Sequence, residues 1–388
     1  MVPGLLLRSV GEWVRDGRQP MTTDARRRVL FLIPTLNGGG AQRVIVTLLQ
    51  HLDRSRFRMT IAAMTTVGAV FHDELPPDVE LIDLDCARVR HSLVKLVRLI
   101  WRLKPDVVFS TLGHLNLALA ALRPLLPGKT RYIARETIVV SEHLKDIGQS
   151  GGWPWAYRRL YPRFDTVVCQ SMDMRNDLVE EFGFPAAKAV VIHNPVDLER
   201  IRALCSQPLT VPLRYEVAAC GHGLVHFVAA GRLVAQKGFD LLIEALAHCA
   251  DPRMRVTILG EGPLQQSLER LATDRGVAQQ IRFVGFQRNP YAFFARADAF
   301  VLSSRFEGFP NVVLEALACG TPVIATPAPG GVAEIIGGIA GCSLATEISA
   351  AALARELLGF SKGTRMAQDV VRPYEVETIV RRYEAAFA

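Results

Sequence analysis

The chain has 388 residues, of which 49% are hydrophobic, and its 45 Lys and Arg outnumber its 38 Asp and Glu to give a net charge of +7. This length is more than one hydrophobic core usually holds, so we expect two globular domains without extended disorder. No apolar run reaches the ~18 residues of a membrane-spanning helix, and no basic stripe is interleaved with aromatic residues. We therefore expect neither a membrane span nor a nucleic-acid partner.

The excess of positive charge suits an anionic ligand or an anionic membrane surface, and an excess that serves only solubility is the alternative. The seven cysteines are scattered without a CxxC pair. This pattern argues against a disulfide framework or a zinc site and for a reducing compartment, and it predicts ordinary buried thiols.

Residues 1–27 precede the first strand pattern and are expected to be an N-terminal extension. Leu6, Val10, Trp13 and Val14 would lie near one face of a helix, with arginines elsewhere, which predicts an interfacial helix. Met21 supports an alternative in which translation starts there and residues 1–20 do not belong to the native protein.

Short β-branched runs alternate with helical patterns along the rest of the chain, which predicts parallel sheets with crossover helices. A first domain is expected at 28–205, with strands at 29–33, 59–63, 81–84, 107–110, 131–134, 166–169 and 190–193. A stretch rich in Pro, Gly and small residues at 206–223 is predicted to be a linker. The second domain at 224–373 has strands at 226–233, 255–260, 281–285, 299–304 and 322–326, and helices at 239–249 and 264–275. The amphipathic pattern within 374–388 predicts a final helix, which the pattern itself assigns to neither domain.

Both domains are therefore expected to be doubly wound α/β domains of the Rossmann-like kind, which bind ligands where the carboxyl ends of strands face a cleft. In the first domain, Gly38, Gly39 and Gly40 lead from a strand into a helix whose amide groups would favour an anion or a sugar. A flexible connection is the alternative there. In the second domain, Arg232 and Lys237 follow a strand just before a helix, which suits a diphosphate, with solvated loop charges as the alternative.

The segment 303–322, SRFEGFPNVVLEALACGTPV, places two carboxylates around a predicted helix start. Pro310 suits the first helical turn, and the amides from Asn311 onward would be unpaired. Glu307 precedes the helix, and Glu315 lies on the same helix face as Asn311. Because a carboxylate accepts hydrogen bonds from vicinal hydroxyls, one would hold a ribose and the other a hexose while amides and cations take the phosphates. The apolar neighbours of Glu315 predict that it is buried with a functional partner, and a surface helix residue is the alternative.

Other strand ends carry further candidates. His114 would bond a sugar hydroxyl or a phosphate, with a purely structural role as the alternative. Arg135 and Glu136 are candidates for binding acceptor or donor, with an internal ion pair as the alternative. Asp83 and Asp85 have the DxD spacing that can hold a divalent metal under a nucleotide, but we expect no metal site there.

These residues and their spacing resemble the retaining glycosyltransferases of family 4, which have the GT-B fold of two Rossmann-like domains facing a central cleft. The likeness runs from Arg28 to the C-terminus and is strongest over 283–331, FVGFQRNPYAFFARADAFVLSSRFEGFPNVVLEALACGTPVIATPAPGG, where the E-x7-E element and its neighbours match. The stretches IPTLNGGGAQRVIVTLL, ARE and EGFPNVVLEAL also resemble bacterial members that extend lipid-linked oligosaccharides.

The resemblance implies roles for the candidate residues. Glu307 would contact hydroxyls of the donor sugar and Glu315 the ribose, while Arg232 and Lys237 neutralise the diphosphate. His114 matches a histidine beside the transferred sugar, so the implied catalytic residues are His114, Glu307, Arg232 and Lys237. The other implied donor contacts are Gly39, Gly40, Gly308, Phe309, Pro310, Asn311 and Val312, and the acceptor-side candidates are Gly38, Arg135 and Glu136. The final helix is implied to return to the N-terminal domain.

The implied reaction is a retaining transfer without a carboxylate nucleophile, in which the acceptor hydroxyl loses its proton to the departing phosphate oxygen. The implied donor is a UDP-linked hexose or N-acetylhexosamine, and the acceptor is a glycan or a lipid-linked oligosaccharide of cell-surface polysaccharide biosynthesis. No cofactor and no essential metal are expected. A cytoplasmic enzyme in peripheral contact with the inner face of the membrane would follow. Two alternatives are an isomerase on the same fold, such as a nucleotide-sugar 2-epimerase, and a binding protein that has lost activity.

Overall fold

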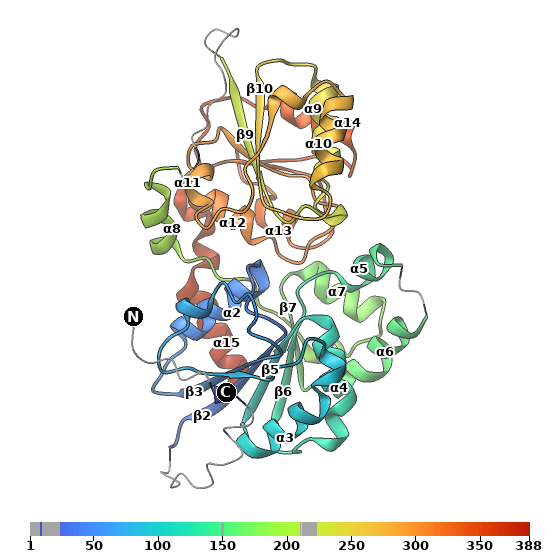
Figure 1. Ribbon diagram of the computed structural model, residues 1–388, viewed down its shortest axis with the longest axis vertical. Helices are drawn as coiled ribbons and strands as arrows, with labels where there is room; N and C mark the ends of the chain where they lie inside the picture. The colour runs from blue at the N-terminus through green and yellow to red at the C-terminus, as the bar shows by residue number, and fades with distance from the viewer. Residues whose placement is uncertain (1–7, 10–23, 149–150, 210, 212–222) are drawn as a thin grey trace. The chain divides into compact units, whose positions relative to one another are not determined.

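The computed structural model describes residues 8–9, 24–148, 151–209, 211 and 223–388 (Figure 1). The chain forms two compact units, an N-terminal unit of Met1–Pro195 with Val376–Ala388 and a C-terminal unit of Val196–Glu375. Each unit is a parallel sheet with helices on both faces. The predicted architecture of two Rossmann-like α/β domains is therefore confirmed.

The N-terminal unit contains an eight-stranded sheet in the order β1-β4-β3-β2-β5-β6-β7-β8, with parallel pairing throughout. Its strands are β1 (Arg8–Ser9), β2 (Arg27–Ile33), β3 (Phe57–Ala63), β4 (Glu80–Asp83), β5 (Val107–Thr111), β6 (Arg131–Arg135), β7 (Thr166–Cys169) and β8 (Ala189–Val191). Successive residues of β2 are buried on opposite faces, with Leu30 in one apolar core and Phe31 in the other. Burial on both faces explains why this strand reads as an uninterrupted apolar run.

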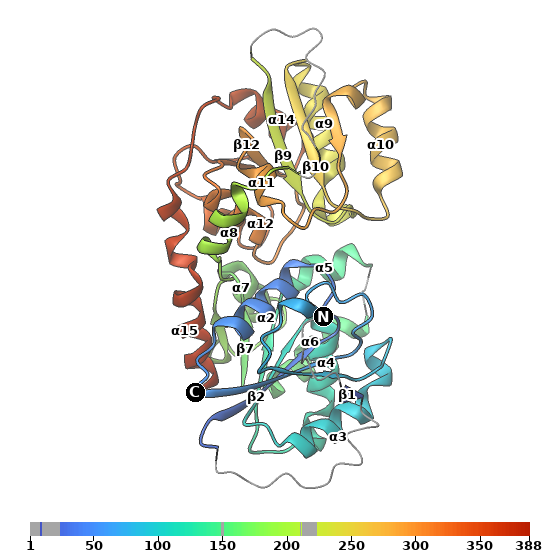
Figure 2. The same cartoon turned by 60° about the vertical axis from the view of Figure 1, so that its left-hand side comes forward.

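Two groups of helices cover this sheet and can be followed in Figure 2. One core contains residues of α3 (Leu93–Leu103), α4 (Gly113–Leu122), α5 (Val140–Asp146), α6 (Gly152–Leu160) and α7 (Met172–Glu180). The other core contains residues of α2 (Gly40–His51) and α15 (Val376–Phe387). The final helix of the chain thus packs in the N-terminal unit.

The C-terminal unit contains a six-stranded parallel sheet in the order β11-β10-β9-β12-β13-β14. Its strands are β9 (Val225–Ala230), β10 (Met254–Leu259), β11 (Ile281–Phe283), β12 (Ala299–Leu302), β13 (Val323–Ala325) and β14 (Ser343–Leu344). One core contains residues of α8 (Leu198–Cys205), α11 (Tyr291–Phe294), α12 (Asn311–Ala318) and α13 (Val332–Ile336), and the other those of α9 (Phe239–Cys249), α10 (Gln265–Asp274) and α14 (Ala350–Gly359). Across the described residues of both units, no helix combines the length and the apolar character needed to cross a bilayer.

Every strand predicted within 28–373 is present, with small differences at its ends. The sequence pattern missed β1 and β14, because each has only two residues and shows no period. Residues 8–9 were expected within an interfacial helix, but they pair with β4 as a strand. The apolar side chains on which that helix was predicted, Leu6, Val10, Trp13 and Val14, lie outside the described residues.

The division between the units differs from the prediction at α8, which the predicted boundaries placed in the first domain. Leu198 and Ile201 of this helix are buried in the apolar core of the C-terminal unit, together with Val196. The division therefore falls before Val196 rather than at the predicted linker, 206–223. Residues 210 and 212–222 of that stretch lie outside the described residues.

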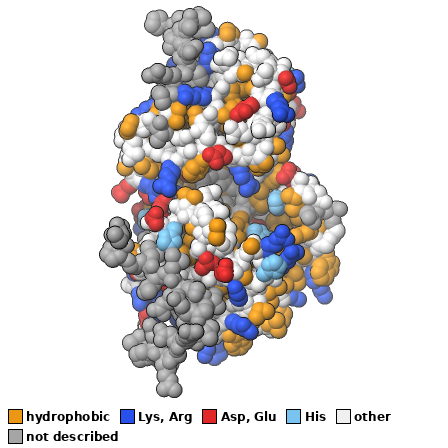
Figure 3. All heavy atoms as spheres, viewed as in Figure 1, with side chains coloured by type: hydrophobic (Ala, Val, Ile, Leu, Met, Phe, Trp, Pro, Cys, Tyr) orange, Lys and Arg blue, Asp and Glu red, His pale blue; other side chains and the backbone are white. Residues whose placement is uncertain are grey.

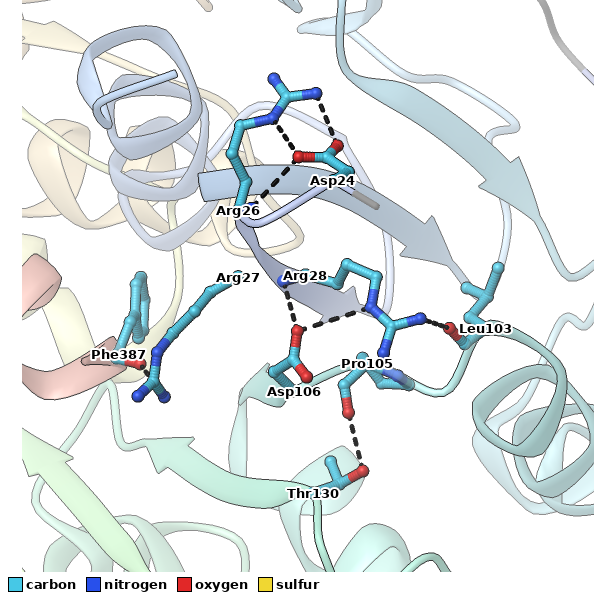
Figure 4. A network of polar contacts seen from close by, with 9 residues as sticks. All are labelled: Asp24, Arg26, Arg27, Arg28, Leu103, Pro105, Asp106, Thr130 and Phe387. Atoms are coloured by element: carbon cyan, nitrogen blue, oxygen red, sulfur yellow. Dashed lines mark hydrogen bonds and ion pairs between the residues drawn. The ribbon is translucent and has the colours of Figure 1, made fainter. Parts of the chain in front are cut away.

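An arginine-rich network holds the beginning of β2 (Figure 4). The backbone amide of Arg28 donates to Asp106 Oδ2 at 2.8 Å, and its guanidinium donates to the carbonyl oxygen of Leu103 at 3.3 Å. The Arg27 guanidinium donates to the carbonyl oxygen of Phe387 at 3.3 Å, which attaches the end of α15 to the first long strand. These arginines lie at the amino end of the strand, the edge opposite to that where doubly wound sheets bind ligands.

A buried carboxyl group joins β6 to α4. Glu136 directly follows β6 and is 1% exposed, and its Oε1 accepts hydrogen bonds from Asn116 Nδ2 at 3.0 Å and from the Tyr161 hydroxyl. Asn116 in turn accepts a hydrogen bond from Ser110 Oγ at 2.7 Å, at the end of β5. Burial raises the pKa of Glu136 to about 7, although the bonds from Tyr161 and Asn116 favour its ionised form.

This burial predicts a pH-dependent stability. The folded chain keeps the Glu136 proton up to a pH of about 7, whereas the unfolded chain releases it near its ordinary pKa of about 4.3. The free energy of unfolding should therefore be highest below the unfolded pKa and fall by roughly 3 kcal/mol as the pH rises through the folded pKa. In Glu136→Gln this decrease in the free energy of unfolding should disappear. Urea unfolding at about pH 5 and at about pH 8 measures it.

Glu180→Gln is the matched control, because Glu180 is an exposed carboxylate on α7 of the same unit. It should keep the pH dependence of the wild type. If Glu136→Gln shows the same dependence as the wild type and this control, the raised pKa of Glu136 is contradicted.

Candidate active site

Each sheet reverses its strand order at one point. In the C-terminal unit β9 leads to β10 and β11 on one side, while β12 leads to β13 and β14 on the other, so the reversal lies between β9 and β12. In the N-terminal unit it lies between β2 and β5. The loops that follow these strands diverge, and the carboxyl edge between them is where such sheets bind ligands.

Lys237 and Glu307 come from the two loops at the reversal point of the C-terminal unit and form an ion pair. Lys237 Nζ lies 2.6 Å from Glu307 Oε1, and the two side chains are 19% and 7% exposed. Ser304 Oγ donates to the same carboxylate oxygen at 2.6 Å. Within the described part of the chain, Glu307 Oε2 has no partner. The carboxylate is thus held through one oxygen, and the other remains as a hydrogen-bond acceptor.

The loops after β9 and β12 are joined by further hydrogen bonds. Ser303 Oγ donates to the carbonyl oxygen of Lys237 at 2.9 Å, and the Arg305 guanidinium bonds Asp240 in the first turn of α9 with an Nη1–Oδ1 distance of 2.9 Å. Burial raises the pKa of Asp240, but the hydrogen bonds and charge of Arg305 outweigh this effect and bring it below its usual value. Gly238 has φ +60, and a Cβ there would lie 2.0 Å from the carbonyl oxygen of Ser303. The close approach of the two loops therefore requires glycine at 238.

The loop after β13 holds the backbone of Glu307. The amide of Glu307 donates to the carbonyl oxygen of Pro329 at 2.9 Å, and the amide of Gly331 donates to that of Gly308 at 2.8 Å. A Cβ on Gly330 would lie 2.5 Å from the carbonyl oxygen of Glu307. Three neighbouring strands thus fix the backbone at Glu307.

Helix α12 begins beside this carboxylate. Pro310 precedes the helix, one position earlier than predicted, and the amides of Asn311 and Val312 come before the first hydrogen bond within the helix. Gly308 and Phe309 are buried, and the Phe309 ring packs on Tyr374 with centroids 5.5 Å apart. The amino end of α12, with its partial positive charge, is therefore part of the same loop cluster.

Glu315 was predicted to be buried, and the structure corrects this expectation. It is half-buried, as are Asn311, Val312 and Cys319, while the remaining residues of α12 are buried in the apolar core. The spacing of four residues from Asn311 to Glu315 and on to Cys319 places these side chains along one strip of the helix. The strip remains accessible because the opposite face of α12 packs against the sheet.

Arg232 lies on the same loop as Lys237 but differs from it in its surroundings. Its side chain is exposed, and the described residues provide no hydrogen-bond or ion-pair partner for the guanidinium. The loop therefore carries one cation fixed by a carboxylate and one that remains available to an anion.

The reversal point of the N-terminal unit carries the other predicted loops. Gly38, Gly39 and Gly40 follow β2 and are exposed, and α2 begins at Gly40. After β5, Leu112 has φ +76, a conformation that costs a non-glycine residue energy and that occurs mostly where function requires it. A Cβ on the following Gly113 would lie 2.3 Å from the Tyr157 hydroxyl oxygen, so glycine is required there.

His114 lies in the first turn of α4, two positions after Leu112, and its side chain is exposed. Partial desolvation by the surrounding loops lowers its pKa, and the charge of His143 on α5 lowers it further. The imidazole is therefore neutral at neutral pH and can either donate or accept a hydrogen bond.

Arg135 and Glu136, the predicted acceptor-side pair, are both buried and do not pair with each other. Arg135 Nη2 donates to Asn194 Oδ1 at 2.7 Å, and its Nε donates to the Tyr383 hydroxyl at 3.2 Å. Glu136 bonds Asn116 and Tyr161 instead. The alternative of an internal ion pair is therefore wrong, because each side chain has its own neutral partners inside the unit. That the two residues bind acceptor or donor stays a prediction.

Several contributing residues were not predicted. Ser304, which holds Glu307, stands three positions before it, and Asp240, which binds Arg305, stands three positions after Lys237. Because these hydroxyl and carboxyl groups stand so close in sequence to the predicted site residues, the sequence could have identified them as hydrogen-bond partners. The sequence gives no such indication for Asn194 and Tyr383, the partners of Arg135, because only the fold brings these distant positions together.

Asp83, the first residue of the discounted DxD pattern, accepts hydrogen bonds from its own loop. Its Oδ1 accepts from the amide of Asp85 at 2.7 Å and its Oδ2 from the amide of Thr66 at 3.2 Å. Among the residues that the structure describes, no three His, Cys, Asp or Glu side chains cluster as metal ligands would.

Two family models match the chain, one in each half. The model described as Glycosyltransferase Family 4 matches residues 38–200, and the model described as Glycosyl transferases group 1 matches residues 223–372. The second range includes Lys237, Glu307 and Glu315. Together the two models account for most of the chain.

Among similar proteins, N-acetylgalactosamine-N,N'-diacetylbacillosaminyl-diphospho-undecaprenol 4-alpha-N-acetylgalactosaminyltransferase of Campylobacter jejuni is 27% identical over 322 residues, which cover 79% of this chain and 82% of that enzyme. The lipopolysaccharide core biosynthesis glycosyltransferase LpsE of Rhizobium meliloti is 44% identical over 166 residues. This second match covers 43% of the chain and spans about half of the relative, 45% of its length.

Solved structures with the same fold include Anabaena HepE in complex with UDP, with a TM-score of 0.73 at 21% identity over 92% of this chain and 99% of that one. Sucrose-phosphate synthase from Thermosynechococcus elongatus has a TM-score of 0.74 at 16% identity, over 93% of this chain and 98% of that one. These likenesses show the GT-B fold. With that fold and with matches to both family models, the chain belongs to the family 4 glycosyltransferases and is a transferase enzyme.

Proposed function

We propose that this glycosyltransferase moves a hexose or an N-acetylhexosamine from a UDP-sugar to a glycan or a lipid-linked oligosaccharide of cell-surface polysaccharide biosynthesis, with retention of the anomeric configuration. The relatives support this class of acceptor, because the Campylobacter enzyme is named for an undecaprenyl-diphosphate-linked substrate and LpsE for lipopolysaccharide core biosynthesis. UDP as the nucleotide carrier is supported by the HepE complexes with UDP and with UDP-glucose.

The observation that carries the proposal is the ion pair of Lys237 and Glu307 at the carboxyl edge between β9 and β12. A diphosphate needs cations, which Lys237 and the exposed Arg232 provide on one loop. A hexose needs fixed hydrogen-bond acceptors, which Glu307 Oε2 provides. The half-buried Glu315 would accept from the vicinal hydroxyls of a ribose. Charge and hydrogen-bonding capacity thus match the three parts of a nucleotide sugar.

The same contacts argue for transfer without a covalent intermediate. Glu307 Oε1 is bonded to an ammonium group and to a hydroxyl, so the carboxylate is neutralised and a weak nucleophile. In the proposed reaction the acceptor oxygen bonds the anomeric carbon as the bond from that carbon to the phosphate oxygen breaks. The bonding electrons pass to that phosphate oxygen, which also receives the acceptor proton, so attack and departure occur on one face. Lys237 and Arg232 stabilise the charge that develops on the diphosphate.

No metal cofactor is proposed for this step, because the two side-chain cations and the amino end of α12 would balance the charge of the leaving group. In the other unit, the exposed loops after β2 and β5 provide neutral hydrogen-bonding groups, including the His114 imidazole. Such groups suit a sugar hydroxyl better than a second anion.

Removing one of the two cations should slow transfer. We expect Lys237→Ala and Arg232→Ala each to lower kcat on the order of 10² to 10³-fold, because each removes a stabiliser of the departing diphosphate. The assay follows UDP release from a UDP-sugar in the presence of EDTA, with NMR of the product to read the anomeric configuration.

Arg253→Ala is the control for these variants, because Arg253 forms an ion pair with Asp251 at the amino edge of the same sheet, before β10. It should turn over at the wild-type rate. Near-normal turnover in both loop variants would contradict the proposal that these cations stabilise the departing diphosphate. Conversion of the UDP-sugar to an epimer without an acceptor would favour the isomerase.

Nucleotide binding should depend on Glu315. At 100 times its dissociation constant, UDP should add roughly 2.7 kcal/mol to the free energy of unfolding of the wild type, a readily measured thermal shift. In Glu315→Ala at the same UDP concentration this shift should be largely lost. Glu269→Ala, which removes an exposed carboxylate from α10, should retain it. An undiminished shift in Glu315→Ala would show that the ribose binds elsewhere.

A lipid-linked acceptor would require contact with the membrane surface, and we propose that α3 provides it at the inner face of the cytoplasmic membrane. Val94 and Trp101 of α3 are 61% and 51% exposed, and Trp101 Nε1 donates to the carbonyl oxygen of Leu125, itself 62% exposed, at 2.9 Å. Arg98 and Arg102 are exposed on the same helix. Figure 3 shows hydrophobic and basic side chains intermixed at this end of the N-terminal unit. Exposed apolar side chains among cations suit an anionic lipid surface.

Sedimentation with vesicles tests this contact. The full chain should bind phosphatidylglycerol vesicles more strongly than phosphatidylcholine vesicles, and Trp101→Ser should weaken that binding several-fold. Trp155→Ser is the matched control, because Trp155 is another exposed tryptophan, on α6 of the same unit. Equal loss in both variants, or no preference for the anionic lipid, would contradict the assignment to α3.

A further inference from the structure

Two thiols meet where α8 packs against α12 in the C-terminal unit. Cys205 is the last residue of α8, Cys319 directly follows α12, and their Sγ atoms are 2.9 Å apart. Both side chains are partly exposed, whereas Cys86, Cys169 and Cys249 are buried. The expectation that the cysteines are ordinary buried thiols is therefore wrong for this pair.

The surroundings make the two thiols unequal. Arg296 donates from Nη1 to the carbonyl oxygen of Cys205 at 3.1 Å and from Nη2 to that of Gln207 at 3.0 Å. Its guanidinium thus offsets the negative end of α8 and places a positive charge beside Cys205. Hydrogen bonding by Cys319, followed by the charge of Arg296, holds the pKa of the Cys205 thiol below its usual value, and burial opposes this effect. In the neutral pair the Cys205 thiol donates to Cys319 Sγ. Because the charge of Arg296 lies beside Cys205, we expect Cys205 to lose its proton before Cys319, which then donates the hydrogen bond.

We propose that Cys205 and Cys319 form a reversible redox pair that closes to a disulfide by exchange with a low-molecular-weight disulfide such as glutathione disulfide. The geometry supports this, because a partly exposed thiolate beside a cation is the reactive kind of cysteine and a second thiol is already in place to resolve the first adduct. The sulfur atoms need to approach by less than ~1 Å to reach bonding distance.

The exchange takes two steps. The Cys205 thiolate attacks one sulfur of glutathione disulfide, forms a mixed disulfide and releases one glutathione thiolate. Cys319 then loses its proton and attacks the Cys205 sulfur, which forms the protein disulfide and releases the second glutathione. Two protein thiols are oxidised and one small disulfide is reduced to two thiols.

The disulfide would tie the end of α8 to the helix that carries Glu315, because Cys319 follows Glu315 by one turn on the same half-buried strip. It would close a long loop of the chain, so it restricts the unfolded state more than the folded one. We expect the oxidised protein to melt on the order of 5 °C or more above the reduced protein.

Peptide mapping of the full-length protein after incubation with glutathione disulfide tests the pair. We expect a linked peptide that joins Cys205 to Cys319, a mass lower by two hydrogens, and loss of both after dithiothreitol. Cys319→Ser should stop at a glutathione adduct on Cys205. Cys205→Ser should react at least about tenfold more slowly, because it lacks the attacking thiolate.

Cys342→Ser is the matched control, because Cys342 is another partly exposed cysteine of the same unit. It should form the linked peptide at the wild-type rate. Absence of the linked peptide from the wild type, or a wild-type glutathione adduct on Cys205 that persists without closing, would overturn the proposal. Equal melting temperatures of the oxidised and reduced proteins would contradict the stabilisation expected from the cross-link between α8 and α12.

Discussion

The buried ion pair of Lys237 and Glu307 is the constraint on which the C-terminal unit depends. Two charges at 19% and 7% exposure lose much of their hydration, and only close mutual contact and further hydrogen bonds offset this loss. The surrounding loops meet that requirement: Ser304 bonds the carboxylate, and Gly238 and Gly330 let neighbouring backbones approach it closely. Because the pair is already formed in the protein without ligand, little free energy is needed to reorganise it during the reaction.

In the N-terminal unit, buried charged side chains have neutral partners instead of forming an ion pair. Arg135 and Glu136 are adjacent in sequence, yet each is surrounded by neutral partners, which are Asn194 and Tyr383 for the first and Asn116 and Tyr161 for the second. Without a cation beside it, Glu136 has a pKa raised to about 7 by its burial. This network fixes the strand ends and the start of α4, from which His114 projects. One unit thus presents fixed charges at its reversal point, and the other presents neutral groups.

The sequence predicted the strands and the two-domain architecture because apolar runs and helical periods are local signals. It also predicted Lys237 and Glu307, because both lie in short loops that follow recognisable strands. It did not predict that they touch, since their contact depends on β9 and β12 being neighbours in the sheet. It misjudged Glu315 because helix composition does not show which strip of α12 remains accessible, and it misassigned α8 because an amphipathic helix can pack on either side of a boundary. The close approach of Cys205 and Cys319 likewise appears only in the packing of two helices.

A crystal structure of the protein with an intact UDP-sugar would test the proposed donor site. We expect diphosphate oxygens within hydrogen-bond distance of Lys237 and Arg232, sugar hydroxyls bonded to Glu307 Oε2, and ribose hydroxyls bonded to Glu315. The proposed site would be contradicted by a nucleotide bound away from the carboxyl edge between β9 and β12, or by one bound there that touches neither Lys237 nor Glu307.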